Sequence, residues 1–283
     1  MTSLISSQKV SKQHFVPQYY IKQFYNKNNK VYRGCIKYNH IKEVTAAQTF
    51  YVPGLYDIEI LGMCFNKIES YYSMMENCLS QLYNHLPNIN DEHIMNADMT
   101  KTLKSAIAMQ YFRTKDMNYD IFTHYCTNLV SIYNKKKDFM LDEFSFINEV
   151  ELSDFEKRIK KGVRKNKKYA LGLIRLLQYT VLPFLLADFK DGNIKIIYHK
   201  TNKYISSDKP VVCTNIEEIL RFENFLYPLA PNILVYSLGA DVTEELIRDE
   251  NKVNEYIYKC EGVYYFRGRN QNNSLFKKLI LYY

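Results

Sequence analysis

Apolar residues recur at helical spacing through the middle of the chain. From residue 63 to residue 86 they stand three or four positions apart, which predicts a helix. A second helical region is expected to begin with Asp98 or Thr100 as its cap and to continue to Tyr133, with a break near Thr114. Together these segments predict a long helical middle.

The helical pattern continues into the second half of the chain. Residues 138–156 are expected to be helical in part. Residues 169–189 are apolar on most faces, which predicts a buried helix that Pro183 kinks or shortens. Residues 241–260 return to helical spacing, with Thr243 as the expected N-cap.

Short extended segments flank these helices. Strands are predicted at residues 31–38, 49–52, 194–198, 211–213, 233–236 and 263–266. The sequence lacks the regular alternation of strands and helices that is typical of a doubly wound sheet. It therefore predicts an α+β fold, in which a mostly helical middle packs with a small, mainly antiparallel sheet. We expect one domain over residues 13–283 after a flexible lead at residues 1–12.

A histidine precedes the first amphipathic segment. Pro17 fixes its own φ and biases the residue before it towards extended backbone, so His14 is expected on extended chain. After the proline, Tyr20, Ile21 and Phe24 recur at helical spacing and can pack against a core. The sequence thus presents a titratable ring at the start of a helix.

Composition narrows the class of protein. The 283 residues include 26 Tyr and 16 Phe but no Trp, which fits either an A/T-rich coding genome or a surface on which bases stack. The six cysteines lie far apart and form no C-x-x-C pair, which argues against a structural zinc site and favours reduced thiols. With no signal-peptide pattern and no apolar run long enough to span a bilayer, we expect a cytoplasmic protein without a membrane partner.

Positive charge is concentrated in one segment. Residues 156–168 hold eight basic residues and one acidic residue, and so contribute +7 of the net charge of +8. Within them Lys160, Lys161, Arg164 and Lys165 are candidates for contacts with a nucleic-acid backbone. The alternative is a solvated helix face or a mobile loop.

Three groups of residues could carry chemistry, while P-loop, G-x-G-x-x-G, G-x-S-x-G and H-E-x-x-H motifs are absent. The first group is His14 with Gln18. A histidine titrates near neutrality and can serve as a general acid or base. It can equally be a structural hydrogen-bonding group.

The second group is Gln110 and Arg113, which share one face of the predicted helix beside apolar positions. Arginine suits bidentate recognition of a phosphate or carboxylate. Arg113 therefore either points into a pocket or forms an internal salt bridge with a carboxylate.

The third group surrounds Asp208, which precedes a proline at the entry to an expected strand. An aspartate at such a position commonly bonds the backbone of the turn. Asp208 could instead orient His14 or help to hold a divalent metal ion. The sequence leaves these roles open, and with them the need for a cofactor.

These groups, in this order, resemble a bacterial family catalogued as domain of unknown function 4238. The pattern H-x-V-P-x-x-Y-x-x-x-F is matched by His14, Val16, Pro17, Tyr20 and Phe24. A glutamate-bearing helix follows around Glu69 and Glu76, then Q-x-x-R-T at Gln110, Arg113 and Thr114. The later matches are S-D-x-P-V at 207–211, P-L-x-P at 228–231 and an asparagine at Asn251 or Asn254. Ile21 departs from the usual leucine, a conservative change for packing.

The resemblance implies one domain, over roughly residues 12–266, whose polar motif residues converge on one site. The resemblance also implies that members of the family occur occasionally on mobile elements and in defence islands, which suggests an antiviral role. The first functional hypothesis is a phosphodiester hydrolase, a nuclease, in which His14, Arg113 and Asp208 are catalytic, Gln18 and Gln110 bind substrate, and the basic segment holds nucleic acid. The alternative is a non-enzymatic binding or sensor protein in which the same residues form a structural network.

Overall fold

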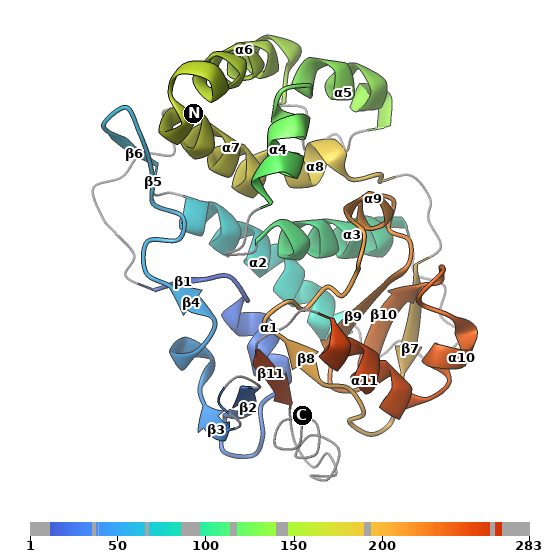
Figure 1. Cartoon of the computed structure of the whole chain (residues 1–283). Coiled ribbons are helices and arrows are strands. Elements are labelled where there is room, and N and C mark those ends of the chain that lie inside the picture. Colours follow the sequence, from blue (N-terminus) through green and yellow to red (C-terminus); the bar gives the residue numbers. More distant parts are fainter. Residues whose placement is uncertain are drawn as a thin grey trace.

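Figure 1 shows the helices and strands of the computed structural model, which describes residues 12–35, 38, 40–65, 68–85, 97–113, 118–139, 147–189, 194–260 and 264–267. Residues 1–11 of the expected lead at 1–12, the break near Thr114 and the start of the last predicted strand at residue 263 lie outside these ranges. Helices occupy the middle of the chain and every described strand pairing is antiparallel. The predicted α+β fold is confirmed.

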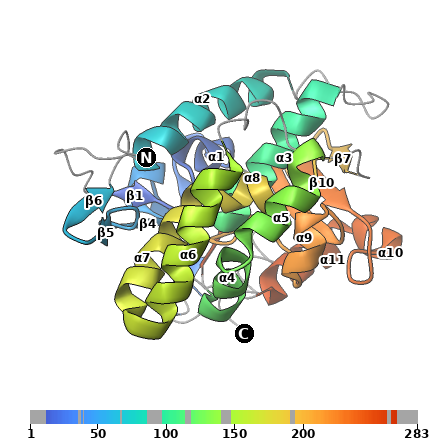
Figure 2. The same ribbon diagram turned by 90° about the horizontal axis from the view of Figure 1, so that it is seen from above.

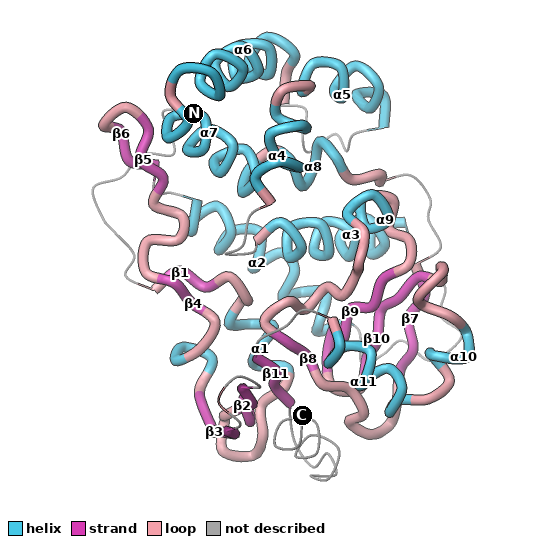
Figure 3. Tube along the Cα trace, in the orientation of Figure 1, coloured by secondary structure: helices cyan, strands magenta, loops and turns pink. Residues whose placement is uncertain are grey.

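The helical middle forms the upper part of the molecule (Figure 3). Its members are α2 (Ile68–His85), α3 (Ala97–Phe112), α4 (Tyr119–Cys126), α5 (Leu129–Lys136), α6 (Glu149–Lys165), α7 (Lys167–Thr180) and α8 (Leu182–Leu186). Seen from above, α6 and α7 lie side by side (Figure 2). A Cβ on Gly162 of α6 would lie only 3.1 Å from that of Ala170 on α7, so these helices pack unusually closely.

Two boundaries in this region differ from the prediction. Residues 63–65 form β6 (Met63–Phe65), which pairs with β5 (Ile58–Ile60), so the predicted helix begins only at Ile68. Leu61 and Gly62 take positive φ angles of 51° and 79° in the turn between the strands. Asp98 and Thr100 lie inside α3 rather than capping it. Pro183 acts as expected: it lies in the first turn of α8, where its missing N–H leaves no helical bond unmade.

The strands near the N-terminus form two small sheets. Strand β1 (Gln13–His14) pairs with β4 (Tyr51–Val52), which confirms that His14 is on extended chain. A four-stranded sheet has the order β3-β2-β11-β8, from β3 (His40–Val44), β2 (Val31–Cys35), β11 (Tyr264–Arg267) and β8 (Ser206–Ser207). A short 3-10 helix, η2 (Ala46–Gln48), connects β3 to β4. The C-terminal part of the chain thus completes an N-terminal sheet.

A three-stranded sheet separates two apolar clusters. Its order is β7-β10-β9, from β7 (Lys195–Tyr198), β10 (Ile233–Ser237) and β9 (Phe225–Ala230). Because side chains alternate along a strand, Tyr227 and Val235 face the main core while Leu226 and Leu234 face a smaller apolar cluster. That cluster packs under α10 (Glu244–Ile247) and α11 (Glu250–Lys259), whereas α9 (Ile216–Leu220) belongs to the main core.

Two predictions near this sheet need correction. Residues 211–213 do not form a strand: Val212 makes an isolated bridge with Leu226. Residues 241–260 form two helices, because Asp249 interrupts the first and caps the second through Asn251 N–H. Thr243 is the N-cap of α10, as predicted, and accepts from Leu246 N–H at 3.2 Å.

Tyr20 joins the N-terminal motif to the C-terminal half. It lies on α1 (Gln18–Gln23), which begins directly after Pro17. Its hydroxyl donates to the carbonyl of Pro228 and lies 2.7 Å from Ser206 Oγ. Its ring stacks on Tyr227 with a centroid distance of 5.5 Å. One buried side chain therefore connects three segments that the family pattern also contains.

Asn254 fixes the chain just before β8. Its side chain accepts from Ile205 N–H at 3.0 Å and donates to Lys203 O at 2.8 Å. Asn251, the other asparagine that fits the family pattern, is exposed on the same helix. These two hydrogen bonds identify Asn254, and not Asn251, as the asparagine with a structural role.

We predict that Asn254→Ala lowers the free energy of unfolding by about 2–3 kcal/mol, because one buried and one partly buried backbone group lose their partner. Asn251→Ala is the matched control on the same helix and should cost less than about 0.5 kcal/mol. Urea denaturation of both variants measures the difference. Equal losses of unfolding free energy in the two variants would contradict the structural role of Asn254.

Candidate functional site

The end of α3 brings Gln110 and Arg113 into the interior. Both side chains point from one helix face, as their spacing of three predicts, and their residues are 8% and 2% exposed. Gln110 Nε2 donates to Phe15 O at 3.1 Å, so α3 holds the N-terminal motif directly. Both residues that the sequence singled out in this region are therefore buried.

Arg113 is surrounded by carboxylates and aromatic rings. Its Nη1 donates to Glu76 Oε1, its Nη2 lies 3.9 Å from Glu69 Oε2, and its Nε donates to Tyr56 Oη at 2.9 Å. The guanidinium carbon lies 4.3 Å from the ring centroid of Tyr72. Arg113 therefore forms the internal salt bridge, one of its two expected roles, and it also lines the pocket described below.

Electrostatics favour the charged arginine and an uncharged glutamate. Burial alone would lower the pKa of Arg113, but Tyr56 and the two glutamates outweigh it and raise that pKa well above its ordinary value. Burial raises the pKa of Glu69 to about 7, against the attraction of Arg113, and the neighbouring Glu76 adds to the rise. Glu69 Oε2 accepts no hydrogen bond from the described residues. A proton on Glu69 thus relieves the crowding of two carboxylates around one cation.

His14 lies beside this cluster and not in the pocket described below. It is 4% exposed, its ring centroid is 5.6 Å from that of Tyr51, and its Nδ1 lies 3.5 Å from Gln18 Nε2. Burial and then the charge of Arg113 lower its pKa, with the backbone of Ala46 acting in the opposite direction. The ring is therefore neutral at pH 7, and its Nε2 has no hydrogen-bond partner among the described residues.

Tyr56 links His14 to Arg113. Its hydroxyl accepts from Arg113 Nε and donates to the backbone carbonyl of His14 at 3.0 Å. Its backbone N–H donates to Gln13 Oε1, and Gln13 Nε2 donates to Asp57 at 2.7 Å. Sequence reasoning missed Tyr56, which lies in the turn after β4 and belongs to no periodic pattern.

The two glutamates were also missed as site residues. They stand seven positions apart on α2, two helical turns, so that they share a face with the buried Tyr72. That spacing, together with an arginine on an apolar helix face, is the signal that could have identified them. Their side chains remain 17% and 20% exposed for Glu69 and Glu76, so the cluster reaches the surface through α2.

Asp208 follows β8 directly in the chain. The preceding Ser207 forms a tight turn in which its hydroxyl donates to Lys209 O at 2.8 Å and accepts from Lys209 N–H at 3.1 Å. Ser206 is bonded to Tyr20, and Asn254 holds the chain before it. Asp208, 6% exposed, is thus placed by contacts on both sides of its own segment.

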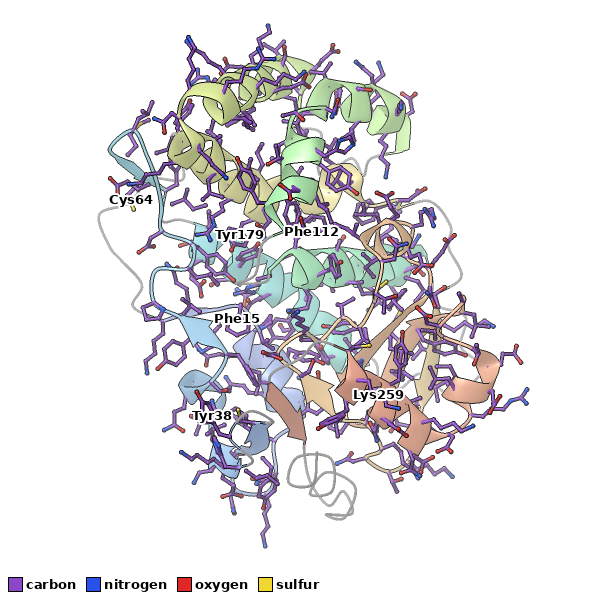
Figure 4. The ribbon with its side chains drawn as sticks, viewed as in Figure 1. Phe15, Tyr38, Cys64, Phe112, Tyr179 and Lys259 are labelled. Carbon is purple, nitrogen blue, oxygen red and sulfur yellow. The ribbon has the colours of Figure 1, made fainter. Side chains whose placement is uncertain are left out.

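Gln110, Arg113 and Asp208 line one pocket of about 480 Å³. Its remaining walls come from the start of α4, from the segment between β8 and α9, and from the end of α11, where Lys259 lies (Figure 4). The other lining residues are Tyr111, Asn118, Ile121, Phe122, Lys209, Pro210, Val211, Val212, Cys213, Thr214, Ile216, Lys259 and Cys260. The pocket joins residues that lie up to 150 positions apart in the sequence (Gln110 to Cys260).

The structure therefore divides the candidate site residues into three groups. Gln110, Arg113 and Asp208 meet at the pocket, whereas His14 and Gln18 are not among the residues that line it. Lys160, Lys161, Arg164 and Lys165 are exposed on α6 and do not line it either. The basic segment is a helix face that continues into the exposed start of α7, and Lys160 is paired there with Glu156.

The buried tyrosines and the cysteines bear on the expectations drawn from composition. Tyr20, Tyr56, Tyr72, Tyr179, Tyr204 and Tyr227 are almost fully buried, so these six serve the core rather than a base-stacking surface. The five cysteines whose side chains the structure describes are free thiols: Cys35, Cys64, Cys126, Cys213 and Cys260. Within the described ranges, no three His, Cys, Asp or Glu side chains are grouped to hold a metal ion, and no helix is long and apolar enough to cross a membrane.

We predict that Glu69 makes stability depend on pH. Its pKa of about 7 in the folded protein exceeds the ordinary 4.5, so the folded state holds this proton more tightly. The stabilisation from this proton is complete below pH 4.5 and is lost as the pH rises through 7. Over that range the free energy of unfolding falls by at most about 3 kcal/mol. Glu69→Gln should remove this dependence on pH. The free energy of unfolding of the variant, measured by urea denaturation, should therefore rise relative to that of wild type between pH 5 and pH 8.

Glu59→Gln, on the exposed edge of β5, is the control carboxylate and should leave the pH profile of wild type unchanged. If the free energies of unfolding of wild type and Glu69→Gln changed with pH in parallel, Glu69 would not hold a proton in the folded protein.

Comparison with known proteins agrees with the geometry. The family model described as "Protein of unknown function (DUF4238)" matches residues 12–253, which include the N-terminal motif, the Gln110–Arg113 pair and Asp208. Among curated proteins and among solved structures, nothing matches the chain. Because the family model covers most of the sequence, the chain belongs to the DUF4238 family.

Proposed function

We propose that this protein is a non-enzymatic binding or sensor protein whose ligand occupies the pocket over Gln110, Arg113 and Asp208. The observation that carries the proposal is the state of Arg113. Its guanidinium donates to Glu76 and Tyr56 and lies 3.9 Å from Glu69. The residue is buried where it lines the pocket. An arginine held in this way builds and orients a binding site, and it has little capacity left to stabilise a reacting phosphate.

The dimensions of the pocket support the same conclusion. A volume of about 480 Å³ falls within the range of roughly 300–1,000 Å³ that is usual for small-molecule sites. Its lining combines apolar walls with a few polar groups of fixed orientation, which is the usual composition of a ligand pocket. His14, with its lowered pKa, serves the network that anchors the N-terminal motif beneath α3.

We predict that a small molecule raises the melting temperature of the wild-type protein by about 5 °C at 100 times its dissociation constant. A thermal-shift screen of small carboxylates, sugar phosphates, nucleosides and nucleotides tests this expectation. Because the chain contains no tryptophan, Ile121→Trp adds a single indole at the pocket wall, and its emission should change with the same compounds.

Tyr38→Trp is the control for that measurement, since Tyr38 is 61% exposed outside the pocket lining. The proposal is overturned if no compound stabilises the wild type, or if the stabilising compounds change the emission of both variants equally.

A phosphodiester hydrolase acting on nucleic acid is the second candidate, favoured by one specific observation. Glu69 has a pKa of about 7 beside a buried arginine, and carboxyl groups tuned to neutrality are common among general acids and bases. In this candidate the exposed basic face of α6 would hold the nucleic-acid backbone, and Asp208 would contact the substrate in the pocket. A cytoplasmic role in antiviral defence is consistent with either candidate.

The hydrolase candidate predicts that wild-type protein with Mg²⁺ or Mn²⁺ cuts single-stranded DNA, duplex DNA or RNA. Asp208→Asn should then lower kcat at least 100-fold with an unchanged melting temperature. Joint charge reversal of Lys161 and Lys165 should raise KM and reduce its dependence on salt. Lys252→Ala, an exposed lysine on α11, is the control that should cut normally. Absence of cleavage by the wild-type protein excludes the candidate.

A further inference from the structure

A small hairpin holds apolar side chains in solvent. Strands β5 and β6 are joined by Leu61 and Gly62, which both have positive φ, as in a type I′ turn. Leu61 is 73% exposed, and Met63, directly after the turn, is 48% exposed. Figure 1 and Figure 2 both show the hairpin at the periphery of the molecule. Two apolar side chains therefore form a protruding tip.

Leu61 is an unfavourable residue for this turn. The first position of a type I′ turn is best occupied by Asn, Asp or Gly, because a bulky side chain is strained at a φ of 51°. At 73% exposure, Leu61 also lacks the burial that makes an apolar side chain stabilising elsewhere. The side chain thus serves neither the turn nor the core of the described structure.

Exposed cations flank the hairpin on α7. Strand β5 passes directly over Gly172, since a Cβ on this glycine would lie 3.0 Å from Cγ1 of Ile60 and 3.4 Å from Glu59 O. Lys168 precedes Gly172 by one helical turn and Arg175 follows it by one, so both share its side of α7 within about 6 Å along the axis. Both are exposed. Positive charge therefore lies on α7 on either side of the strand.

The positive charge continues from α7 onto α6. Five exposed cations there form no ion pair with another described residue: Lys161, Arg164, Lys165, Lys168 and Arg175. The basic segment at 156–168 thus reaches the hairpin through Lys168, its last residue. Glu59, the exposed carboxylate of the hairpin, lies on the opposite face of the ribbon from Ile60, because side chains alternate along a strand.

From the apolar tip and the cations beside it, we infer that this surface binds a bilayer that contains anionic lipids. Leu61 and Met63 enter the boundary between head groups and acyl chains, while the basic segment and Arg175 hold anionic head groups. An apolar anchor and a polybasic patch together give stable attachment, since a single such signal binds only weakly. This attachment is independent of the ligand that the pocket binds.

A bilayer suits the tip better than nucleic acid does. Leu61 and Met63 are aliphatic and offer no aromatic ring on which a base could stack. Aliphatic side chains instead gain from leaving water for hydrocarbon, and a fluid layer needs no shape that matches a protruding tip. The expectation of no membrane partner came from the lack of a signal peptide and of a spanning run, and contact with a bilayer surface requires neither.

Co-sedimentation with phosphatidylcholine vesicles, with and without about 30% phosphatidylserine, tests the attachment. Wild-type protein should bind the anionic vesicles at least about ten times more tightly than the neutral ones, and about 0.5 M NaCl should weaken that binding severalfold. Leu61→Asn should weaken it at least about tenfold without lowering the melting temperature, because asparagine is favoured at this turn position. Lys168→Glu combined with Arg175→Glu should weaken it to a similar extent.

Each variant has a matched control. Val150→Asn removes another exposed apolar side chain, which lies between Glu149 and Glu151 instead of among cations, and it should bind as wild type does. Arg248→Glu combined with Lys252→Glu makes the same change in net charge at exposed cations away from the hairpin, and it should bind nearly as wild type does.

Fluorescence follows the tip itself. Because the chain contains no tryptophan, Leu61→Trp carries a single indole. Its emission should shift to shorter wavelength on the anionic vesicles, whereas the emission of Val150→Trp should not. Three results would each overturn the attachment: no binding of wild type to anionic vesicles, equal binding of Leu61→Asn, or unchanged emission of bound Leu61→Trp. If DNA releases the protein from the vesicles and its own binding requires Leu61, the surface belongs to nucleic acid and the lipid attachment is wrong.

Discussion

The fold depends on how one buried arginine is neutralised. Arg113 could not remain inside the protein without Glu76 and Glu69, and removing one member of such a buried group typically costs about 3–5 kcal/mol. The requirement fixes α2 against α3, because both glutamates must face the end of the same helix. It also fixes the N-terminal strand, since Tyr56 bonds both Arg113 and the carbonyl of His14. The register of three separate segments follows from one charge.

A second set of contacts brings the C-terminal half to the same place. Tyr20 reaches Ser206 and Pro228, and Asn254 holds the backbone that leads into β8. Pro228 lies on β9, an edge strand of its sheet, where a residue without an N–H disrupts the ladder least. These contacts give the segments around Tyr20, Pro228 and Asn254 an architectural role. They carry the backbone of Asp208 to the end of α3, and the pocket forms where the two meet.

The sequence predicted the local features of this site and few of its long-range ones. Pro17 and helical spacing were enough to predict extended chain at His14 followed by α1, and a spacing of three placed Gln110 and Arg113 on one face. The partners of Arg113 were missed, because Tyr56 belongs to no periodic pattern and the glutamates lie on another helix, where their spacing of seven was the one available signal. The strand predicted at 211–213 was wrong for a related reason: local β-propensity there is satisfied by one bridge to Leu226 and by the pocket wall.

The burial of Arg113 also explains why a site rich in ionisable groups is better suited to recognition than to charge stabilisation. An arginine that is to stabilise a transition state must have hydrogen-bonding capacity that the ground state leaves unused. Here two glutamates and a tyrosine already surround the guanidinium, and burial, with a smaller contribution from Glu76, raises the pKa of Glu69 to about 7. Displacing a glutamate to reach a phosphate would leave a carboxylate stranded in the interior. A ligand that leaves this cluster intact and bonds to Gln110 and Asp208 avoids that cost.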